Sequence, residues 1–182
     1  DEEEELKEDI KRILEELRRL AKEHEELNRR INKELEDLVR EHKKRLEDAL
    51  KRLREIVRDR GNDEDVTRRM DEILDELRKH SEDLKRRMDK LLRENEEHSD
   101  RLRKRIKELT DRLRRRVEDL VRKRGRVEEL EKVLKEAEDD VERIKKRLKR
   151  INDESRKHVE RLKEELDRAD KRIEDEVEKL KK

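Results

Sequence analysis

The segment Asn95-Glu96-Glu97-His98-Ser99 places polar side chains where the surrounding sequence repeats Leu and Ile. On both sides of it, apolar residues recur at steps of three and four, which is the period of one face of a helix. Asn95, His98 and Ser99 fall on that same face. A buried polar group without a partner costs about 1–3 kcal/mol, so these side chains need polar neighbours from elsewhere in the chain.

Polar residues interrupt the apolar face of the two other helical segments as well. His24 and Asn28 do so in the first, and Asn152, Ser155 and His158 do so in the third. Neutral imidazole offers one donor and one acceptor, Asn offers two of each, and a Ser hydroxyl can play both roles. These residue types can therefore satisfy one another inside a core.

Gly61 and Gly125 divide the 182-residue chain into three segments of similar length. Glycine is the preferred residue just after a helix C-terminus, because it adopts a positive φ without steric cost. The chain has no proline, so it contains no obligate helix breaker. We therefore predict one domain over residues 1–182, with helices over about 2–59, 63–123 and 127–181.

The two short connections fix how the helices align. They make consecutive helices antiparallel neighbours. A turn at Gly61 brings residues whose numbers sum to 122 to one height, and a turn at Gly125 does so for a sum of 250. His24 is then level with His98, and His98 with Asn152. The sequence predicts an all-α fold, an antiparallel up-down-up three-helix bundle.

The histidine spacing predicts the course of the helices. His24 and His42 are 18 residues apart, as are His80 and His98. Eighteen residues make five turns at about 3.6 residues per turn, so a stripe with this repeat needs little supercoiling. We expect long, nearly straight helices.

The register predicts two buried polar layers. The first contains His24, Asn28, Asn95, His98, Ser99, Asn152, Ser155 and His158, and the second contains His42, His80 and Ser81. The small side chain of Ala169 leaves room for the imidazoles of the second layer. The alternative is that several of these residues lie at the edge of the apolar face and contact water.

Charged residues make up 63% of the chain, but the formal net charge is only +1. Interspersed Glu, Asp, Lys and Arg support helices through pairs four residues apart, each worth about 0.2–0.5 kcal/mol. No apolar run approaches the roughly 20 residues of a membrane span. We expect no nucleic-acid partner and no membrane partner.

The chain resembles parametrically designed helical bundles with buried hydrogen-bond networks. The resemblance rests on three equal segments, His, Asn and Ser in the core, a Glu/Lys/Arg surface and the absence of Phe, Tyr and Trp, and it covers the whole chain. It implies a structural scaffold without a natural function. Members of that family with buried histidines were built to loosen or dissociate in acid, which implies destabilisation below about pH 6. Many of them are oligomers of hairpins, whereas this chain supplies three helices itself.

Other functions have less support in the sequence. A tetrahedral zinc site needs three or four suitable ligands, and no His here has another His four residues later. Catalysis needs a nucleophile, a base and a concave site, which a solid bundle does not suggest. We predict no enzyme activity, no cofactor and no metal site. Spectrin-like natural repeats are also long three-helix units, but they fit the absence of aromatic residues poorly.

The width of the apolar face bears on self-association. A three-helix core needs about two inward positions per heptad, which most of each stripe supplies. Further apolar residues widen the stripe in places, namely Leu14, Val39, Leu50, Leu74, Leu92 and Val133. We favour a monomer that requires no partner, with a homo-oligomer or a helix-exchanging assembly as the alternative.

Overall fold

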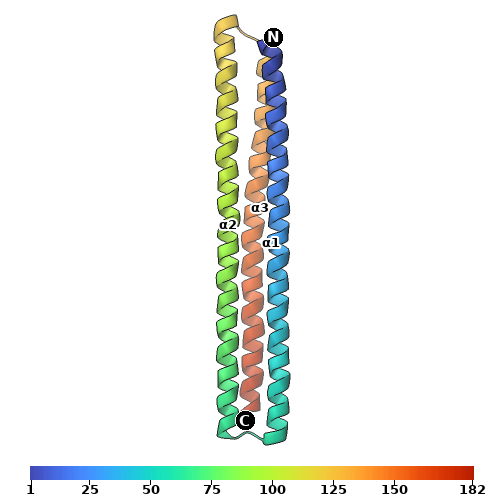
Figure 1. Ribbon diagram of the computed structural model, residues 1–182, viewed down its shortest axis with the longest axis vertical. Coiled ribbons are helices and arrows are strands. Elements are labelled where there is room, and N and C mark those ends of the chain that lie inside the picture. The colour runs from blue at the N-terminus through green and yellow to red at the C-terminus, as the bar shows by residue number, and fades with distance from the viewer. The chain divides into compact units, whose positions relative to one another are not determined.

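The structure is a computed structural model that describes residues 1–182, and it consists of three helices joined by two short connections (Figure 1). They are α1 (Glu2–Arg60), α2 (Glu64–Arg124) and α3 (Glu128–Leu180). Each has acidic residues in its first turn and a basic residue in its last turn, which matches the sign of the helix dipole. The predicted all-α, antiparallel three-helix bundle is confirmed.

Both connections contain a glycine with a positive φ, 76° at Gly61 and 82° at Gly125. The N–H of Gly61 donates to the Val57 carbonyl at 2.9 Å, which completes the last turn of α1. Asp63 directly precedes the next helix, and its Oδ1 accepts a hydrogen bond from the Val66 N–H at 2.8 Å. Asp63 therefore satisfies one of the free N–H groups at the start of α2.

The chain divides into two compact units, each of which contains a part of all three helices. Unit 1 contains residues 1–29 and 94–154, and unit 2 contains residues 30–93 and 155–182. That the two units form one domain over residues 1–182 stays a prediction.

Ion pairs within the units show the helix directions. In unit 1, Asp9 pairs with Arg116, so early residues of α1 meet late residues of α2. Two pairs in each unit join α1 to α3 with the same offset of 122 residues. They are Arg18–Asp140 and Glu25–Arg147 in unit 1, and Lys43–Glu165 and Arg54–Glu176 in unit 2. In each unit, α1 is thus parallel to α3, and in unit 1 it is antiparallel to α2.

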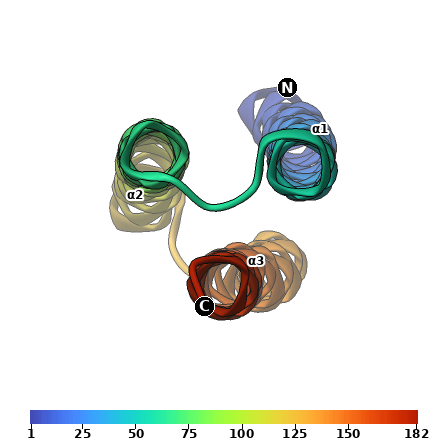
Figure 2. The ribbon, with the colours of Figure 1, turned by 90° about the horizontal axis from the view of Figure 1, so that it is seen from below.

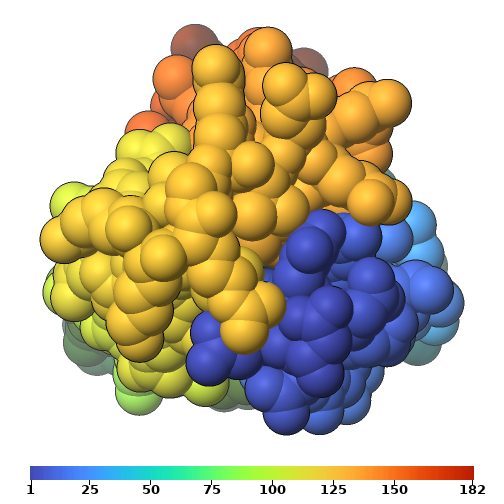
Figure 3. Space-filling model, turned by 90° about the horizontal axis from the view of Figure 1, so that it is seen from above, coloured from blue at the N-terminus to red at the C-terminus, as the bar shows by residue number.

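The core of unit 1 contains two aliphatic clusters built from all three helices. Their buried members are Leu6, Ile10, Leu113, Val117, Leu120, Leu130 and Ala137 in one cluster, and Leu17, Ala21, Leu102, Ile106, Leu109, Val141, Ile144 and Leu148 in the other. Figure 3 shows the start of α1 against the segment that connects α2 to α3. There Arg124 forms an ion pair with Asp1 at 3.3 Å.

Unit 2 repeats this arrangement with its own two clusters. Their buried members are Leu35, Val39, Leu84, Met88, Val159, Leu162 and Leu166 in one cluster, and Leu46, Leu50, Leu53, Val66, Met70, Leu74, Ile173 and Val177 in the other. The near end in Figure 2 belongs to unit 2, and there the three helices surround a common centre. Asn62 links the connection between α1 and α2 to the end of α3, because its Nδ2 donates to the Leu180 carbonyl at 2.8 Å.

The apolar residues that widen the stripes pack within their own units. Val39, Leu50 and Leu74 are buried, and Leu14, Leu92 and Val133 are partly buried against the same clusters. No large hydrophobic side chain is exposed. None of the three helices combines the length and the apolar character that a membrane crossing requires.

Candidate functional site: two histidine layers

The polar layer of unit 1 centres on His24 of α1 and His98 of α2. Their Nδ1 atoms are 2.8 Å apart, and the rings are stacked with centroids 5.0 Å apart and an interplanar angle of 14°. His24 is completely buried and His98 is half-buried. A contact this short between two ring nitrogens requires one to donate and the other to accept. The two neutral rings must therefore be opposite tautomers at Nδ1.

An amide pair lies beside the rings. Asn95 Nδ2 donates to Asn28 Oδ1 at 2.6 Å, and both residues are buried. Asn95 precedes His98 by three residues and Asn28 follows His24 by four, so the pair lies one helical turn away from the rings. The two hydrogen bonds tie α1 to α2 at this height.

Asn152 brings α3 to the same layer. It is buried, and its side chain is close enough to His24 to favour the protonated ring. Neither His24 Nε2 nor Asn152 Oδ1 has a hydrogen bond of normal geometry, so this contact is a weak one. The fully buried Ser99 Oγ also lacks a partner. Some polar atoms of the layer thus have no hydrogen-bond partner, and burying them in this way costs free energy.

Burial lowers the pKa of His24 below its ordinary value, because a charged ring loses its hydration in the core. Repulsion from a charged His98 lowers the pKa further. The contact with Asn152 acts in the opposite direction but is the smallest of the three causes.

The polar layer of unit 2 has the same pair geometry. The Nδ1 atoms of His42 and His80 are 2.8 Å apart, with ring centroids separated by 5.0 Å and an interplanar angle of 18°. His42 is completely buried, and His80 is half-buried. Ser81 is also buried beside the pair, and its Oγ has no hydrogen-bond partner.

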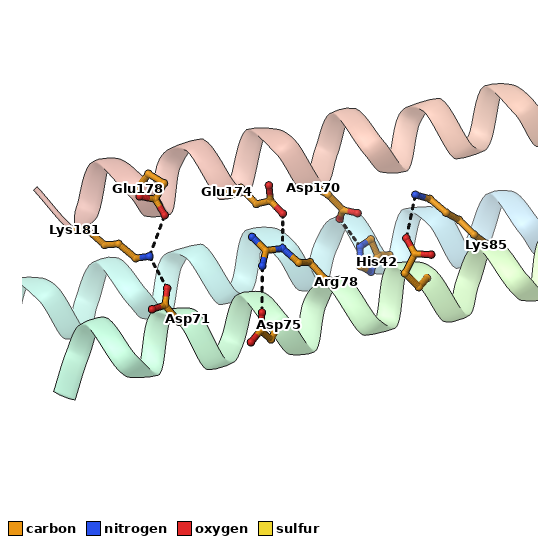
Figure 4. Close-up of polar contacts among 10 residues, drawn as sticks. His42, Asp71, Asp75, Arg78, Lys85, Asp170, Glu174, Glu178 and Lys181 are labelled. Atoms are coloured by element: carbon orange, nitrogen blue, oxygen red, sulfur yellow. Dashed lines mark hydrogen bonds and ion pairs between the residues drawn. The ribbon is translucent and has the colours of Figure 1, made fainter. Parts of the chain in front are cut away.

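A carboxylate distinguishes the layer of unit 2 from that of unit 1. Asp170 of α3 places its Oδ1 2.9 Å from His42 Nε2, as Figure 4 shows. A carboxylate only accepts hydrogen bonds, so Nε2 of His42 must carry the hydrogen. Nδ1 of neutral His42 is then an acceptor, and His80 must donate from its own Nδ1. Asp170 thus determines the tautomers of both rings.

Some features of the surroundings of His80 lower its pKa, and others raise it. Burial is the largest cause and lowers the pKa, followed by the positive charge of Arg45 and the repulsion from a charged His42. Asp83 and Asp170 raise the pKa but do not outweigh the other causes. The net result is a pKa below the ordinary value.

Surface ion pairs flank the histidine layer of unit 2 (Figure 4). Arg78 of α2 contacts Glu174 of α3 at 2.7 Å and Asp75 of its own helix at 3.2 Å. Lys181 joins Glu178 and Asp71 in the same manner, at 3.0 and 2.5 Å. Exposed pairs of this kind each contribute about 0–1 kcal/mol, so they orient the helices more than they stabilise them.

The structure divides the predicted first layer between the two units. His24, Asn28, Asn95, His98, Ser99 and Asn152 belong to unit 1, whereas Ser155 and His158 belong to unit 2. Ser155 is buried. His158 is half-buried, and its Nε2 lies 3.2 Å from Glu36 Oε1, although the angle is not that of a hydrogen bond.

Asp170 is a site residue that the sequence prediction did not include. A charged residue next to the apolar Ala169 is ordinarily expected on the solvent-facing surface. The sequence does indicate the position of Asp170, because the two turn registers together place residue 170 level with His42 and His80. A carboxylate at the height of two inward histidines is a candidate hydrogen-bond acceptor.

The chemistry of the two layers is therefore hydrogen bonding and proton binding. No cluster of three or more His, Cys, Asp or Glu side chains is arranged to hold a metal ion. A surface groove of unit 1 with a volume of about 450 Å³ is lined mostly by charged residues, including Arg18, Asp140 and Arg147. Neither histidine pair lines this groove.

Comparison with known proteins finds similarity among solved structures. No protein-family model matches the chain, and no curated protein is similar to it in sequence. Among solved structures, the chain is similar to a computationally designed three-helix bundle, with 19% sequence identity and a TM-score of 0.49. The alignment covers 99% of this chain and 92% of that one.

Proposed function

We propose that this chain is a designed structural scaffold whose stability falls below about pH 6 because its buried histidine pairs must take up protons. The observation that carries the proposal is the Nδ1–Nδ1 contact of 2.8 Å between His24 and His98 in the core of unit 1. The sequence supports a designed origin. Its three segments are similar in length, its core has no aromatic residue, and polar residues recur at matched heights.

Each histidine pair holds one shared hydrogen between its Nδ1 atoms. A first added proton can go to a distal Nε2 and leave that hydrogen bond intact. A second proton puts a hydrogen on both Nδ1 atoms, so the two donors point at each other across 2.8 Å. A doubly protonated pair must therefore separate, which disrupts the packing of the helices that carry it.

The sign of the pH effect follows from the lowered pKa values of His24 and His80. Above the unfolded-state pKa of about 6.5, these rings are neutral in both states and stability is at its full value. Below that pH, the unfolded chain binds more protons than the folded one. Stability is therefore lost as pH falls from about 6.5 towards the folded pKa values.

A monomeric state is part of the proposal. The apolar residues beyond the narrow stripe pack against clusters of their own unit, and no large hydrophobic side chain is exposed. Large exposed apolar patches are the usual mark of an interface between chains. We expect sedimentation equilibrium at pH 7.5 to give the mass of one chain, about 22.7 kDa. A mass of two or more chains would favour the homo-oligomer instead.

The central test compares guanidinium melts at pH 7.5 and 5.0 for the parent and for a variant with all five histidines changed to Gln. Gln is polar but does not titrate, so the variant keeps the acid response of the carboxylates and loses that of the imidazoles. We expect the parent midpoint to fall clearly more than the variant midpoint. Equal shifts in the two proteins would show that the histidines are not the sensor.

A further inference from the structure

The positive charge of the chain is concentrated on one part of α2. Residues 101–124 contain twelve Lys or Arg and only four Asp or Glu, whereas the whole chain has a net charge of +1. This stretch lies wholly in unit 1. This segment is therefore strongly basic, although the net charge of the complete chain is close to zero.

The outward face of this segment forms a basic ridge, which consists of Arg101, Lys104, Arg105, Arg112, Arg115 and Lys123. All six residues are exposed. At about 100° per residue, their positions fall within an arc of about 100° on one side of the helix. Two acidic residues share this face, and one of them, Asp119, pairs with Arg122 at 3.3 Å.

The residues of the basic ridge differ from the arginines beside them on α2 in their ion pairing. The flanking arginines pair with acids of the neighbouring helices, Arg116 with Asp9 and Arg114 with Glu138, each at 2.8 Å. None of the six ridge residues forms an ion pair within the chain. Their positive charges remain available to an external anion.

The near-neutral charge of the whole chain leads to the expectation of no nucleic-acid partner, but on the basis of this unpaired basic ridge we propose that it is a docking surface for the phosphate backbone of duplex DNA. From residue 101 to 123 the ridge is about 33 Å long, at about 1.5 Å per residue. One turn of B-DNA rises about 34–36 Å, so the ridge laid along the duplex spans about one turn and meets phosphates where the strands cross it. Four of the six residues are Arg, whose guanidinium group matches phosphate oxygens in a bidentate manner.

The composition of the ridge favours duplex DNA over other polyanions. Proteins that bind single strands without sequence preference stack the bases on aromatic side chains, and this chain has none. Insertion at a membrane surface uses an apolar helix face, and no large hydrophobic side chain is exposed. Contacts to phosphates alone carry no sequence information, so the binding is independent of sequence.

The neighbouring helix limits the docking to one side of unit 1. Residues 1–29 of α1 contain twelve acidic and seven basic residues. Their net negative charge repels phosphates, whereas the ridge attracts them. The phosphate backbone is therefore held in front of α2, without contacts to α1.

The test measures binding of the full chain to a fluorescein-labelled duplex of about 24 base pairs by fluorescence anisotropy, over about 20–200 mM salt. The test variant changes three ridge residues, Arg101→Gln, Arg112→Gln and Arg115→Gln. The matched control replaces three exposed Lys or Arg residues of unit 2 that form no ion pair, with Arg30→Gln, Lys44→Gln and Arg52→Gln. Both variants have the same net charge, and circular dichroism melts verify that both remain folded.

We expect the parent to bind in the micromolar range at low salt, with affinity falling steeply as salt rises. The ridge variant should lose at least about tenfold in affinity, and its salt slope should be lower by about 2–3, because each lost phosphate contact removes about 0.9. The control should stay within about twofold of the parent. The proposal is overturned if the parent does not bind the duplex, or if both variants lose affinity equally. Equal or tighter binding to a single strand, or to vesicles of anionic phospholipid, would also overturn it.

Discussion

The Asp170 carboxylate accepts a hydrogen bond from Nε2 of the completely buried His42 at 2.9 Å. No carboxylate holds the corresponding nitrogen of His24 in unit 1, whose Nε2 lacks a hydrogen bond of normal geometry. The two histidine pairs share one ring geometry, yet only one of them has an acidic neighbour that fixes its tautomers. Both the tautomers and the acid response of the unit 2 pair should therefore depend on Asp170.

The tautomers of the unit 2 pair are the first prediction. At pH 7.5 we expect His42 to carry its hydrogen at Nε2 and His80 to carry its hydrogen at Nδ1, because Asp170 can only accept. Nitrogen-15 chemical shifts of the two rings distinguish these forms. In Asp170→Asn the amide can either donate or accept, so the preference should weaken. The opposite tautomers in the parent would contradict the hydrogen-bond chain.

The second prediction concerns the acid response of the same variant. The negative charge of Asp170 raises the pKa of His80, so replacing it with Asn should lower that pKa further. A lower folded pKa increases the loss of stability as pH falls below about 6.5. Guanidinium melts should show a larger midpoint shift between pH 7.5 and 5.0 for Asp170→Asn than for the parent. Asp167→Asn, at an exposed position that pairs with Lys85, is a matched control and should respond as the parent does.

The third prediction tests the polar layer of unit 1. His98→Ala should destabilise the protein by about 1–3 kcal/mol at pH 7.5, because it leaves Nδ1 of the buried His24 without its partner. Replacing His24, Asn28, Asn95, His98 and Asn152 together with Leu or Ile should instead raise the free energy of unfolding, since these five side chains then have no polar groups that lose hydration on folding. Urea melts measure both effects. A multiple variant that unfolds at lower urea than the parent would contradict a buried layer.

The fourth prediction concerns the turn between α1 and α2. Gly61 has a φ of 76°, and a Cβ added there would meet no atom within 4 Å. Gly61→Ala should therefore cost about 1–2 kcal/mol through the backbone conformation alone. Gly61→Asn should cost less, because Asn adopts positive φ more readily. Thermal melts of the two variants provide the comparison, and equal losses would show that φ is not the cause.

Several features of this protein could be predicted from the sequence. Gly61 and Gly125 marked both connections, because only glycine adopts their positive φ without cost and no other residue interrupts the helical period. The three- and four-residue spacing of Leu, Ile and Val indicated three helices with one apolar face each. These are local properties of the chain, so they do not depend on how the helices pack.

The tertiary structure alone decided which side chains meet. It brought Asp170 to His42, left Ser99 Oγ and Ser81 Oγ without partners, and assigned Ser155 and His158 to unit 2. It also separated the ion-paired Arg114 and Arg116 from the unpaired Arg112 and Arg115 beside them. The angular position of each residue around its own helix follows from its place in the sequence. The rotation of each helix about its axis and the rotamers at each contact are set only when the helices pack, because burial and hydrogen bonding act across helices and not along them.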